Sequence, residues 1–376
     1  MKAIHIIGIL ILVVIIIGGA AVLIKPSTTG NATAQEPIKI GATLPLTGDI
    51  AEIGTSIQNA MKLATEEINS QGGVNGRNLT FIYEDDSCNG AKSVTIVTKL
   101  ASVDKVVAII GPVCSTAVLP AAPVAENAKV ILFSGSATNA KITEAGDYIF
   151  RNAPSDALQG KFAAEFAYST LGVKKIVIEY ANEEYSSGLK DVFAKRFTEL
   201  GGQVLLSQAH DRAATDLRTQ IIKIKDANPE MIYMASFPLD GGNFLKQARE
   251  LGLNKTVMGS ETLDDPQVIS IAQDAANGLI YTKPKELTTQ QFKNNFKTRF
   301  GSDPLIFSDY YYDAVYLIAN AMKTCGENTA CIKTELYKVK DYHGASGVIT
   351  LDSNGDLATA EYSVKTIVNK TVTNYA

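Results

Sequence analysis

The chain has 376 residues, of which 46% are hydrophobic and 20% are charged, and its formal net charge is −4. This length and composition allow a large buried core and two or three domains, whereas the slightly negative charge without a basic patch argues against a nucleic-acid partner. Only three histidines are present, and His210 and His343 lie far apart along the chain, which argues against a histidine-rich metal site.

The N-terminus carries a nearly unbroken apolar run over residues 4–24. This run is long enough to span a bilayer as a helix and exceeds the usual apolar core of a cleaved signal peptide. We therefore expect residues 1–25 to form an uncleaved signal anchor in the cell membrane and residues 26–36 to form a flexible linker. A cleaved signal remains the alternative, because residues 32–34 resemble a cleavage site.

From residue 37 onward, strand-like apolar runs alternate with helical patterns. Strands are predicted at 38–44, 79–85, 106–110 and 130–133, and helices at 53–70, 91–102 and 116–127. This alternation predicts a mainly parallel sheet with helices on both faces. Within the last of these helices, Pro120 and Pro123 are tolerable only near its first turns.

The same alternation then starts again. Helices are predicted at 157–171, 187–200, 217–226 and 243–251, and strands at 175–180, 204–208, 231–235 and 256–258. Two helices follow at 290–300 and 309–323, and residues 351–357 are predicted to form a hairpin turn. A second parallel sheet is the simplest account, so we expect two α/β lobes with a ligand cleft between them.

Two strand ends are candidates for ligand contact. The apolar runs 106–110 and 130–133 each end in a cluster of Gly, Ser and Thr, at 111–116 and 134–139, and each is followed by a predicted helix start. Strand ends of this kind direct small hydroxyls and free backbone N–H groups into one crevice. The pattern predicts a cradle for a small anion such as a carboxylate.

The four cysteines fit an extracytoplasmic location. Cys88 and Cys114 each follow a predicted strand, and neighbouring parallel strands would bring them together as a disulfide. Cys325 and Cys331 enclose a short polar loop. The alternative is four buried free thiols, and a zinc site is disfavoured because no paired C-x-x-C spacing occurs.

Six segments together carry a family resemblance. The chain resembles the branched-chain amino-acid-binding proteins, the leucine/isoleucine/valine type of extracytoplasmic solute-binding protein that feeds ABC transporters. The segments occur in the order typical of that family, within residues 38–366. They are Ile40-Gly-Ala-Thr-Leu-Pro-Leu-Thr-Gly48, Glu66-Glu-Ile-Asn-Ser-Gln-Gly-Gly-Val-Asn-Gly-Arg77, Glu84-Asp-Asp-Ser-Cys88, Ile110-Gly-Pro-Val-Cys-Ser115, residues 134–139 and residues 347–356.

The resemblance implies a type I periplasmic-binding-protein fold, with two Rossmann-like lobes joined by three crossovers. Lobe 1 would hold residues 37–157 and 285–342, and lobe 2 residues 158–284 and 343–376. The implied protein is a monomer without catalytic activity, cofactor or metal. It would capture a hydrophobic amino acid and deliver it to a permease. A sensor subunit for an amino acid, amide or small carboxylate is the alternative.

Carried over onto lobe 1, the family's contacts fall on hydroxyl residues. Ser115, at a helix start after the third strand, would bind the ligand carboxylate, although a serine there usually only caps its helix. Ser136 would contribute its backbone carbonyl, and Thr138 its hydroxyl and N–H. The alternative for these two is an ordinary turn in which Thr138 caps a helix.

Lobe 2 would contribute Tyr185, closing over the ligand, and Glu261, pairing with its ammonium group. The alternatives are a half-exposed surface tyrosine and a solvated loop glutamate. Phe237 stands where the family has an aromatic residue. Ile53 stands at a second position where the family often has an aromatic residue, so the expected pocket for the ligand side chain is apolar but has an aliphatic residue there. A carboxylate site on one lobe and an acid on the other would together bind a zwitterion without leaving an unpaired charge buried.

Overall fold

The computed structural model describes residues 36–375. The predicted signal anchor at 1–25 and nearly all of the predicted linker lie outside the described residues. Within residues 36–375, no helix is both long enough and apolar enough to cross a membrane. These residues form one compact unit that contains both predicted lobes.

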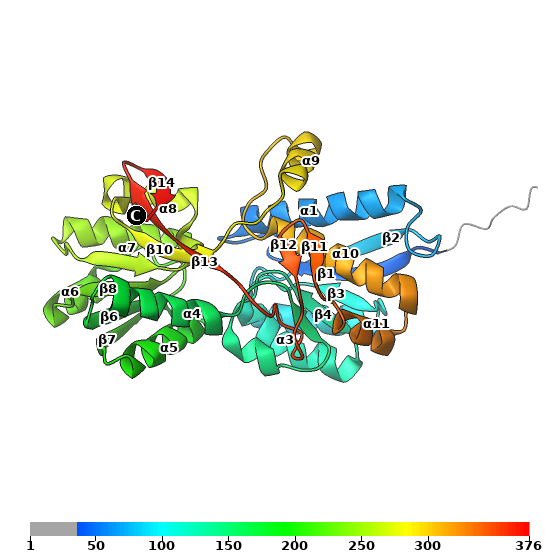
Figure 1. Ribbon diagram of the computed structural model, residues 1–376, viewed down its shortest axis with the longest axis horizontal. Coiled ribbons are helices and arrows are strands. Elements are labelled where there is room, and N and C mark those ends of the chain that lie inside the picture. The colour runs from blue at the N-terminus through cyan, green and yellow to red at the C-terminus, as the bar shows by residue number, and fades with distance from the viewer. Residues whose placement is uncertain (1–35, 376) are drawn as a thin grey trace, which may run out of the picture. The chain divides into compact units, whose positions relative to one another are not determined.

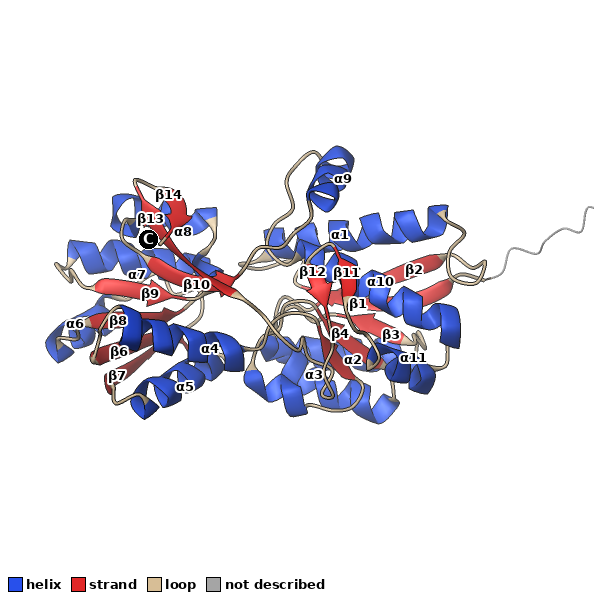
Figure 2. Ribbon diagram, in the orientation of Figure 1, coloured by secondary structure: helices blue, strands red, loops and turns tan. Residues whose placement is uncertain are grey.

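The first lobe is built on a five-stranded sheet whose paired strands are all parallel, in the order β2-β1-β3-β4-β5. The strands are β1 (Ile38–Leu44), β2 (Leu79–Asp85), β3 (Ala108–Ile110), β4 (Ile131–Ser134) and β5 (Ile149–Arg151). The helices are α1 (Ala51–Ser70), α2 (Gly90–Ser102), α3 (Ser115–Ala128), α9 (Gln290–Phe300), α10 (Ser308–Cys325) and α11 (Thr329–Leu336). Figure 2 shows these helices around the strands. The predicted parallel sheet is confirmed.

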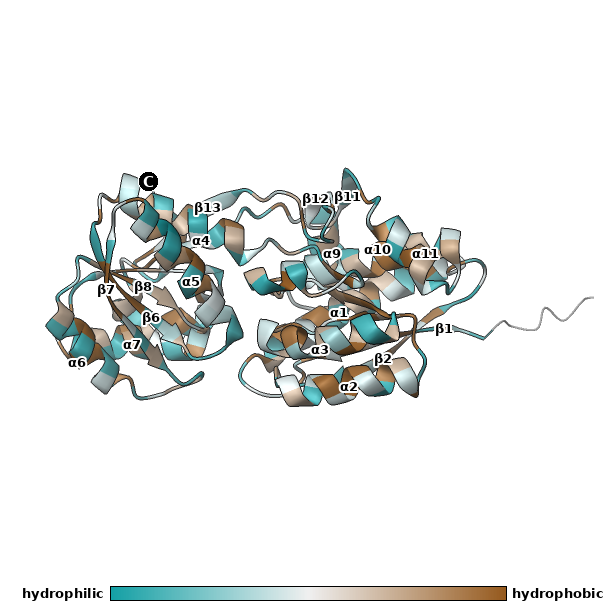
Figure 3. Cartoon of the chain, turned by 90° about the horizontal axis from the view of Figure 1, so that it is seen from below, coloured by the Kyte–Doolittle hydropathy of each residue, from teal (hydrophilic) through white to brown (hydrophobic). Residues whose placement is uncertain are grey.

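The core of the first lobe forms where α1 and α10 pack over β1. Ile40 and Leu44 on β1, and Ile57 and Met61 on α1, are completely buried. These α1 residues belong to the helix face that the sequence pattern predicts to be apolar. In Figure 3, hydrophobic and hydrophilic residues also alternate along helix α2, which packs against α3. Each fully buried side chain of this size stabilises the fold by about 1.5–3 kcal/mol.

The second lobe is built on a seven-stranded sheet in the order β14-β13-β10-β9-β8-β6-β7. The strands are β6 (Lys175–Ala181), β7 (Gln203–His210), β8 (Met231–Ala235), β9 (Thr256–Gly259), β10 (Ile280–Pro284), β13 (Tyr362–Val368) and β14 (Thr371–Asn374). The helices are α4 (Asp156–Glu165), α5 (Glu184–Glu199), α6 (Arg218–Ala227), α7 (Pro238–Glu250) and α8 (Pro266–Ala272). Strands β13 and β14 run antiparallel, so this sheet is mixed rather than parallel throughout.

The chain crosses between the lobes after β5, after β10 and before β13 (Figure 1). The third crossing lies later than expected. A small hairpin of β11 (Tyr342–Gly344) and β12 (Gly347–Ile349) precedes it. Ile349 and Leu351 are buried in the core of the first lobe. This burial is favourable because it removes two apolar side chains from water. Residues 343–351 therefore pack with the first lobe, whereas we expected the second lobe to resume at residue 343.

Two helices also differ in detail from expectation. Pro120 and Pro123 lie well inside α3 rather than near its first turns. The helix persists because its buried face, which includes Val118 and Ala121, packs in the core between the sheet and its neighbours. Helix α7 begins at Pro238, five residues before the predicted start, since the fixed backbone angle of proline suits the first helical position.

Candidate functional site

A partly open cavity lies where loops of both lobes meet, and a position between domains is typical of small-molecule sites. The loops after β3 and β4 form one wall, and α5 with the loops after β8 and β9 forms the other. The structure brings together here every ligand-binding residue predicted from the sequence. The lining residues are Ile50, Ile53, Val113, Cys114, Ser115, Ser136, Thr138, Tyr185, Phe237, Pro238, Glu261, Thr262, Asp264, Asp265, Ile306 and Phe307.

Ser115 is the first residue of α3 rather than its cap. The capping position belongs to Cys114, whose side chain makes no capping hydrogen bond. The Ser115 hydroxyl instead accepts a hydrogen bond from the backbone N–H of Asn139 at 3.2 Å. A hydroxyl that accepts in this way still has its own proton to donate. Together with the positive end of the α3 dipole, that proton favours an anion at this wall.

Ser136 and Thr138, in the loop after β4, present different groups to the cavity. The Ser136 hydroxyl donates to the backbone carbonyl of Val113 at 2.8 Å and also contacts the Tyr311 hydroxyl. Its side chain therefore already has hydrogen-bond partners within the protein. The Thr138 hydroxyl is buried near the Asp156 carboxylate but makes no well-formed hydrogen bond among the described residues. Buried polar groups are nearly always hydrogen-bonded in a complete assembly, so this hydroxyl is suited to a ligand.

Glu261 supplies a buried carboxyl group on the opposite wall. It lies at the end of β9 and is only 2% exposed. The Tyr185 hydroxyl donates to Glu261 at 3.0 Å, and the Gln159 side-chain amide donates to its other oxygen. Burial raises the pKa of Glu261, and these two hydrogen bonds counter part of that rise. The half-exposed tyrosine and solvated glutamate considered as alternatives are excluded, because both side chains are buried.

Asp156, which the sequence analysis missed, adds a second buried carboxylate behind Thr138. It is the first residue of α4, its backbone N–H donates to the Thr138 carbonyl at 2.7 Å, and it is completely buried. Neither carboxylate oxygen has a hydrogen-bond partner among residues 36–375. Burial raises the pKa of Asp156 well above its ordinary value, the charge of Glu261 raises it further, and Thr138 and Arg151 offset part of the effect. Two neighbouring buried acids form a site that attracts a cation.

A buried ionic network holds the wall that carries Phe237. His210, at the end of β7, lies between the carboxylates of Glu179 and Asp240, which are all completely shielded from solvent. Burial alone would lower the pKa of His210, but the two carboxylates raise it to about 10. Asp240 in turn accepts the backbone N–H of Phe237 at 3.0 Å. A cationic His210 therefore fixes the start of α7, and with it Phe237.

Apart from Thr262, Asp264 and Asp265, the remaining surface of the cavity is apolar. Ile50 and Ile53, at the start of α1, face this space together with Phe237. Ile306 and Phe307 complete it from a loop about 190 residues further along the chain from the β3 loop, and sequence patterns gave no signal for them. Phe307 adopts a left-handed backbone conformation with φ of 69°, which is rare for a bulky residue and marks a constrained position. An aliphatic side chain would be buried favourably here.

Both predicted disulfides are present, Cys88–Cys114 and Cys325–Cys331, and the alternative of free thiols is excluded. Cys114 lies immediately before Ser115, so the first disulfide ties the anion-binding end of α3 to the loop after β2. No cluster of metal-ligating side chains occurs within residues 36–375.

Polar contacts join the two lobes beside the cavity. The Arg212 side chain donates to Asp49 at 3.0 Å, and its guanidinium group lies 3.9 Å from the centre of the Phe237 ring. The Thr116 hydroxyl donates to Glu183 at 2.7 Å. These contacts hold the lobes against each other across the cavity.

The profile of the family described as "Periplasmic binding protein" matches residues 37–371, nearly the whole described chain. The chain belongs to this family. The resemblance predicted from the sequence is thereby confirmed, as is the type I α/β fold. Periplasmic binding proteins bind solutes rather than transform them, and the relatives are binding proteins, not enzymes.

Individual relatives of this periplasmic binding protein support the same family assignment. A leucine-, isoleucine-, valine-, threonine- and alanine-binding protein of Pseudomonas aeruginosa is 29% identical, covering 88% of this chain and 90% of the relative. A leucine-binding protein of Thermotoga maritima is 29% identical, with a TM-score of 0.83 over 90% of this chain and 98% of its own. A branched-chain amino acid transporter substrate-binding protein of Streptococcus pneumoniae, solved with isoleucine, is 27% identical, with a TM-score of 0.80 over 89% and 97%.

Proposed function

We propose that this protein captures a branched-chain or other hydrophobic amino acid outside the cytoplasm and delivers it to the permease of an ABC transporter. The names of its relatives support both the ligand class and the transport role. The predicted anchor at residues 1–25 would keep the binding lobes at the membrane, close to that permease. The support for this anchor is the apolar run at residues 4–24.

The observation that carries the proposal is the opposite polarity of the two ends of one cavity. Ser115 and the α3 N-terminus favour a carboxylate, whereas the buried acid Glu261 on the opposite wall favours an ammonium group, and Asp156 adds a second acid outside the lining. An α-amino acid carries both charges on one carbon. The apolar surface around Ile53 and Phe307 would then take a hydrophobic side chain.

Titration calorimetry of the purified, ligand-depleted protein against the twenty amino acids tests the proposal. We expect leucine, isoleucine or valine to bind with a Kd of about 1 μM or lower, which corresponds to about −8 kcal/mol. Aspartate is expected not to bind, because the pocket would bury its side-chain carboxylate beside the carboxylates of Glu261, Asp264 and Asp265. Heat from none of the twenty amino acids would refute the ligand assignment while leaving the fold intact.

Asp156→Asn is expected to change stability and affinity in opposite directions. At pH 7 the variant should unfold at a higher temperature than the wild type without ligand, because burial makes the Asp156 carboxyl group much harder to ionise in the folded protein than in the unfolded chain, and Asn carries no such cost. The same variant should bind leucine about tenfold more weakly, because part of the attraction for the ammonium group is lost. Thermal unfolding and calorimetry measure the two effects.

The gain in stability of the Asp156→Asn variant over the wild type should depend on pH. The unfolded chain ionises Asp156 near pH 4, whereas its raised pKa keeps the folded form protonated to higher pH. The folded state then binds more protons, so the wild type loses stability as pH rises from about 4 through the folded pKa. The advantage of Asp156→Asn should therefore vanish near pH 4 and be largest above that pKa. An advantage that is constant from pH 4 to 8 would contradict this origin.

A further inference from the structure

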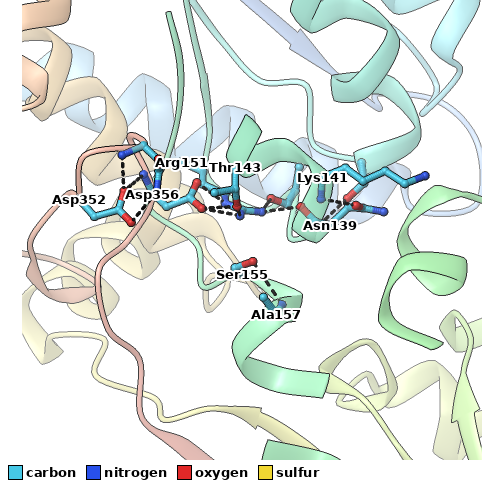
Figure 4. Close-up of polar contacts among 11 residues, drawn as sticks. Asn139, Lys141, Thr143, Arg151, Ser155, Ala157, Asp352 and Asp356 are labelled. Atoms are coloured by element: carbon cyan, nitrogen blue, oxygen red, sulfur yellow. Dashed lines mark hydrogen bonds and ion pairs between the residues drawn. The ribbon is translucent and has the colours of Figure 1, made fainter. Parts of the chain in front are cut away.

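Arg151 is a large, completely buried side chain outside the cavity lining. It is the last residue of β5, directly before the first crossover between the lobes. Its charge is neutralised by Asp356 through two parallel hydrogen bonds, from Nε to Oδ1 and from Nη2 to Oδ2, both 2.7 Å long. Figure 4 shows this pair within a chain of polar contacts that runs towards Asn139.

On one side, Arg151 holds the loop that carries Ser136 and Thr138. Its Nη1 donates to the backbone carbonyl of Asn139 at 2.8 Å and lies 3.4 Å from that of Ala137. The carbonyl between them, that of Thr138, accepts the backbone N–H of Asp156 at 2.7 Å. Three consecutive carbonyls of this loop are thus held by residues at the two ends of the first crossover.

Peptide planarity passes this constraint to the ligand side of the loop. A peptide carbonyl and the N–H that follows it lie in one plane and point in opposite directions. Holding the carbonyl of Ala137 therefore aims the N–H of Thr138 away from Arg151. In the next peptide, the N–H of Asn139 donates to the hydroxyl of Ser115, which orients that hydroxyl as well.

On the other side, Arg151 holds the start of the third crossover. Its backbone N–H donates to the carbonyl of Gly355 at 2.9 Å. Thr143 connects the same groups, since it accepts from Arg151 Nη2 at 2.8 Å and donates to Asp356 at 2.7 Å. Asp356 lies a few residues before β13, where the chain enters the second lobe. One buried guanidinium group therefore joins two crossovers to the loop that bears Thr138.

We propose that Arg151, oriented by Asp356, is a positioning residue that aims the carboxylate-binding groups of Thr138 and Ser115. This rests on the proposed function, because it assigns those groups to the carboxylate end of an amino acid. Arg151 does not contact the ligand. Its removal should therefore weaken the recognition of the carboxylate much more than that of the ammonium group, where the loss of its charge only raises the pKa of Asp156 further.

L-Leucine and L-leucinol separate this role from a general structural one. Leucinol keeps the side chain and ammonium group of leucine but has a neutral alcohol in place of the carboxylate. Arg151→Met should lower the affinity for leucine at least about 30-fold and change that for leucinol by less than about threefold. Arg151→Lys, which keeps the charge but not the planar fork, should fall between the wild type and Arg151→Met.

The matched control is Arg299→Met. Arg299 also makes two hydrogen bonds to one carboxylate, that of Glu66, at 2.9 Å each, but this pair is half exposed on the surface of the first lobe. This control should bind both ligands within about twofold of the wild type. If Arg151→Met does not fold, Asp356→Asn provides the test. It keeps Arg151 and should lower the preference for leucine over leucinol at least about fivefold.

The outcomes are distinct. A selective loss of leucine affinity supports the positioning role. Equal weakening of both ligands, or an unchanged preference in Arg151→Met or Asp356→Asn, overturns it in favour of a purely structural ion pair. A wild-type protein that binds neither ligand would instead refute the proposed function.

Discussion

Replacing Glu261 by Gln is expected to weaken the binding of leucine about 100-fold, because a charge-assisted hydrogen bond in a buried site contributes about 1.5–3 kcal/mol. Gln has nearly the same shape and still fits beside Gln159 and Tyr185, so the pocket should keep its form. What is lost is the negative charge facing the ligand ammonium group. Asp156 would remain as a buried acid near that end, which accounts for residual binding.

Calorimetry with leucine measures this loss. Glu199→Gln, on the surface of the same lobe and paired there with Arg196, is the matched control and should bind like the wild type. Circular dichroism and thermal unfolding should show that Glu261→Gln is folded. Wild-type affinity in Glu261→Gln would mean that the ammonium group lies elsewhere, and the assignment of the two ends of the cavity would have to be abandoned.

Loss of the Cys88–Cys114 disulfide should reduce both stability and affinity. It closes a loop of 26 residues, and its removal as Cys88→Ser with Cys114→Ser should lower the free energy of unfolding by about 3–4 kcal/mol. Because Cys114 immediately precedes Ser115, the start of α3 should also become less fixed. We expect leucine to bind at least about tenfold more weakly.

The second disulfide provides the comparison. Cys325–Cys331 spans only 6 residues, at the end of α10 and in α11, and neither residue lines the cavity. Removing it should lower the free energy of unfolding by about 2 kcal/mol and leave the affinity for leucine within about twofold of the wild type. Denaturant unfolding and calorimetry on both double variants test the contrast. Equal affinities in the two variants would show that the first disulfide does not serve the site.

The sequence predicted those parts of the site that follow strand ends. Ser115, Ser136 and Thr138 come directly after buried strands of one parallel sheet, so their convergence follows from the geometry of such sheets. Glu261 and Tyr185 came only from the family resemblance, because a single acid or aromatic residue in a loop carries no local signal. Their burial depends on how the lobes meet, which no periodic pattern encodes.

The residues that sequence analysis missed share a different property. Asp156 reads as an ordinary acid in the first turn of a helix, where it is favourable without any ligand. Phe307 precedes α10 in a left-handed conformation that local sequence does not predict. His210 acts through Asp240, and Arg151 acts through Asp356, and both partners lie far along the chain from the residue they contact. Tertiary contacts, rather than local propensity, decide the roles of these four residues.

The same reasoning explains the differences in the fold. The sequence predicts a hairpin turn at residues 351–357, and the family resemblance places the chain from residue 343 onward in the second lobe. The burial of Ile349 and Leu351 in the core beside α10 decides for the first lobe. At the other end of the second sheet, β13 and β14 close the edge by antiparallel pairing, joined by a turn at Asn369 and Lys370 in which both residues have positive φ. Neither residue is a glycine, so the usual turn signal is absent.

The central claim is that the cavity recognises both charges of an amino acid at once. Calorimetry of the wild-type protein with L-leucine, 4-methylpentanoate and 3-methylbutylamine tests it most directly, because the last two each retain the side chain and one charge. Each missing charge leaves buried polar groups without a partner, so we expect leucine to bind at least about 1,000-fold more tightly than either analogue. An analogue that binds within about tenfold of leucine would contradict the claim.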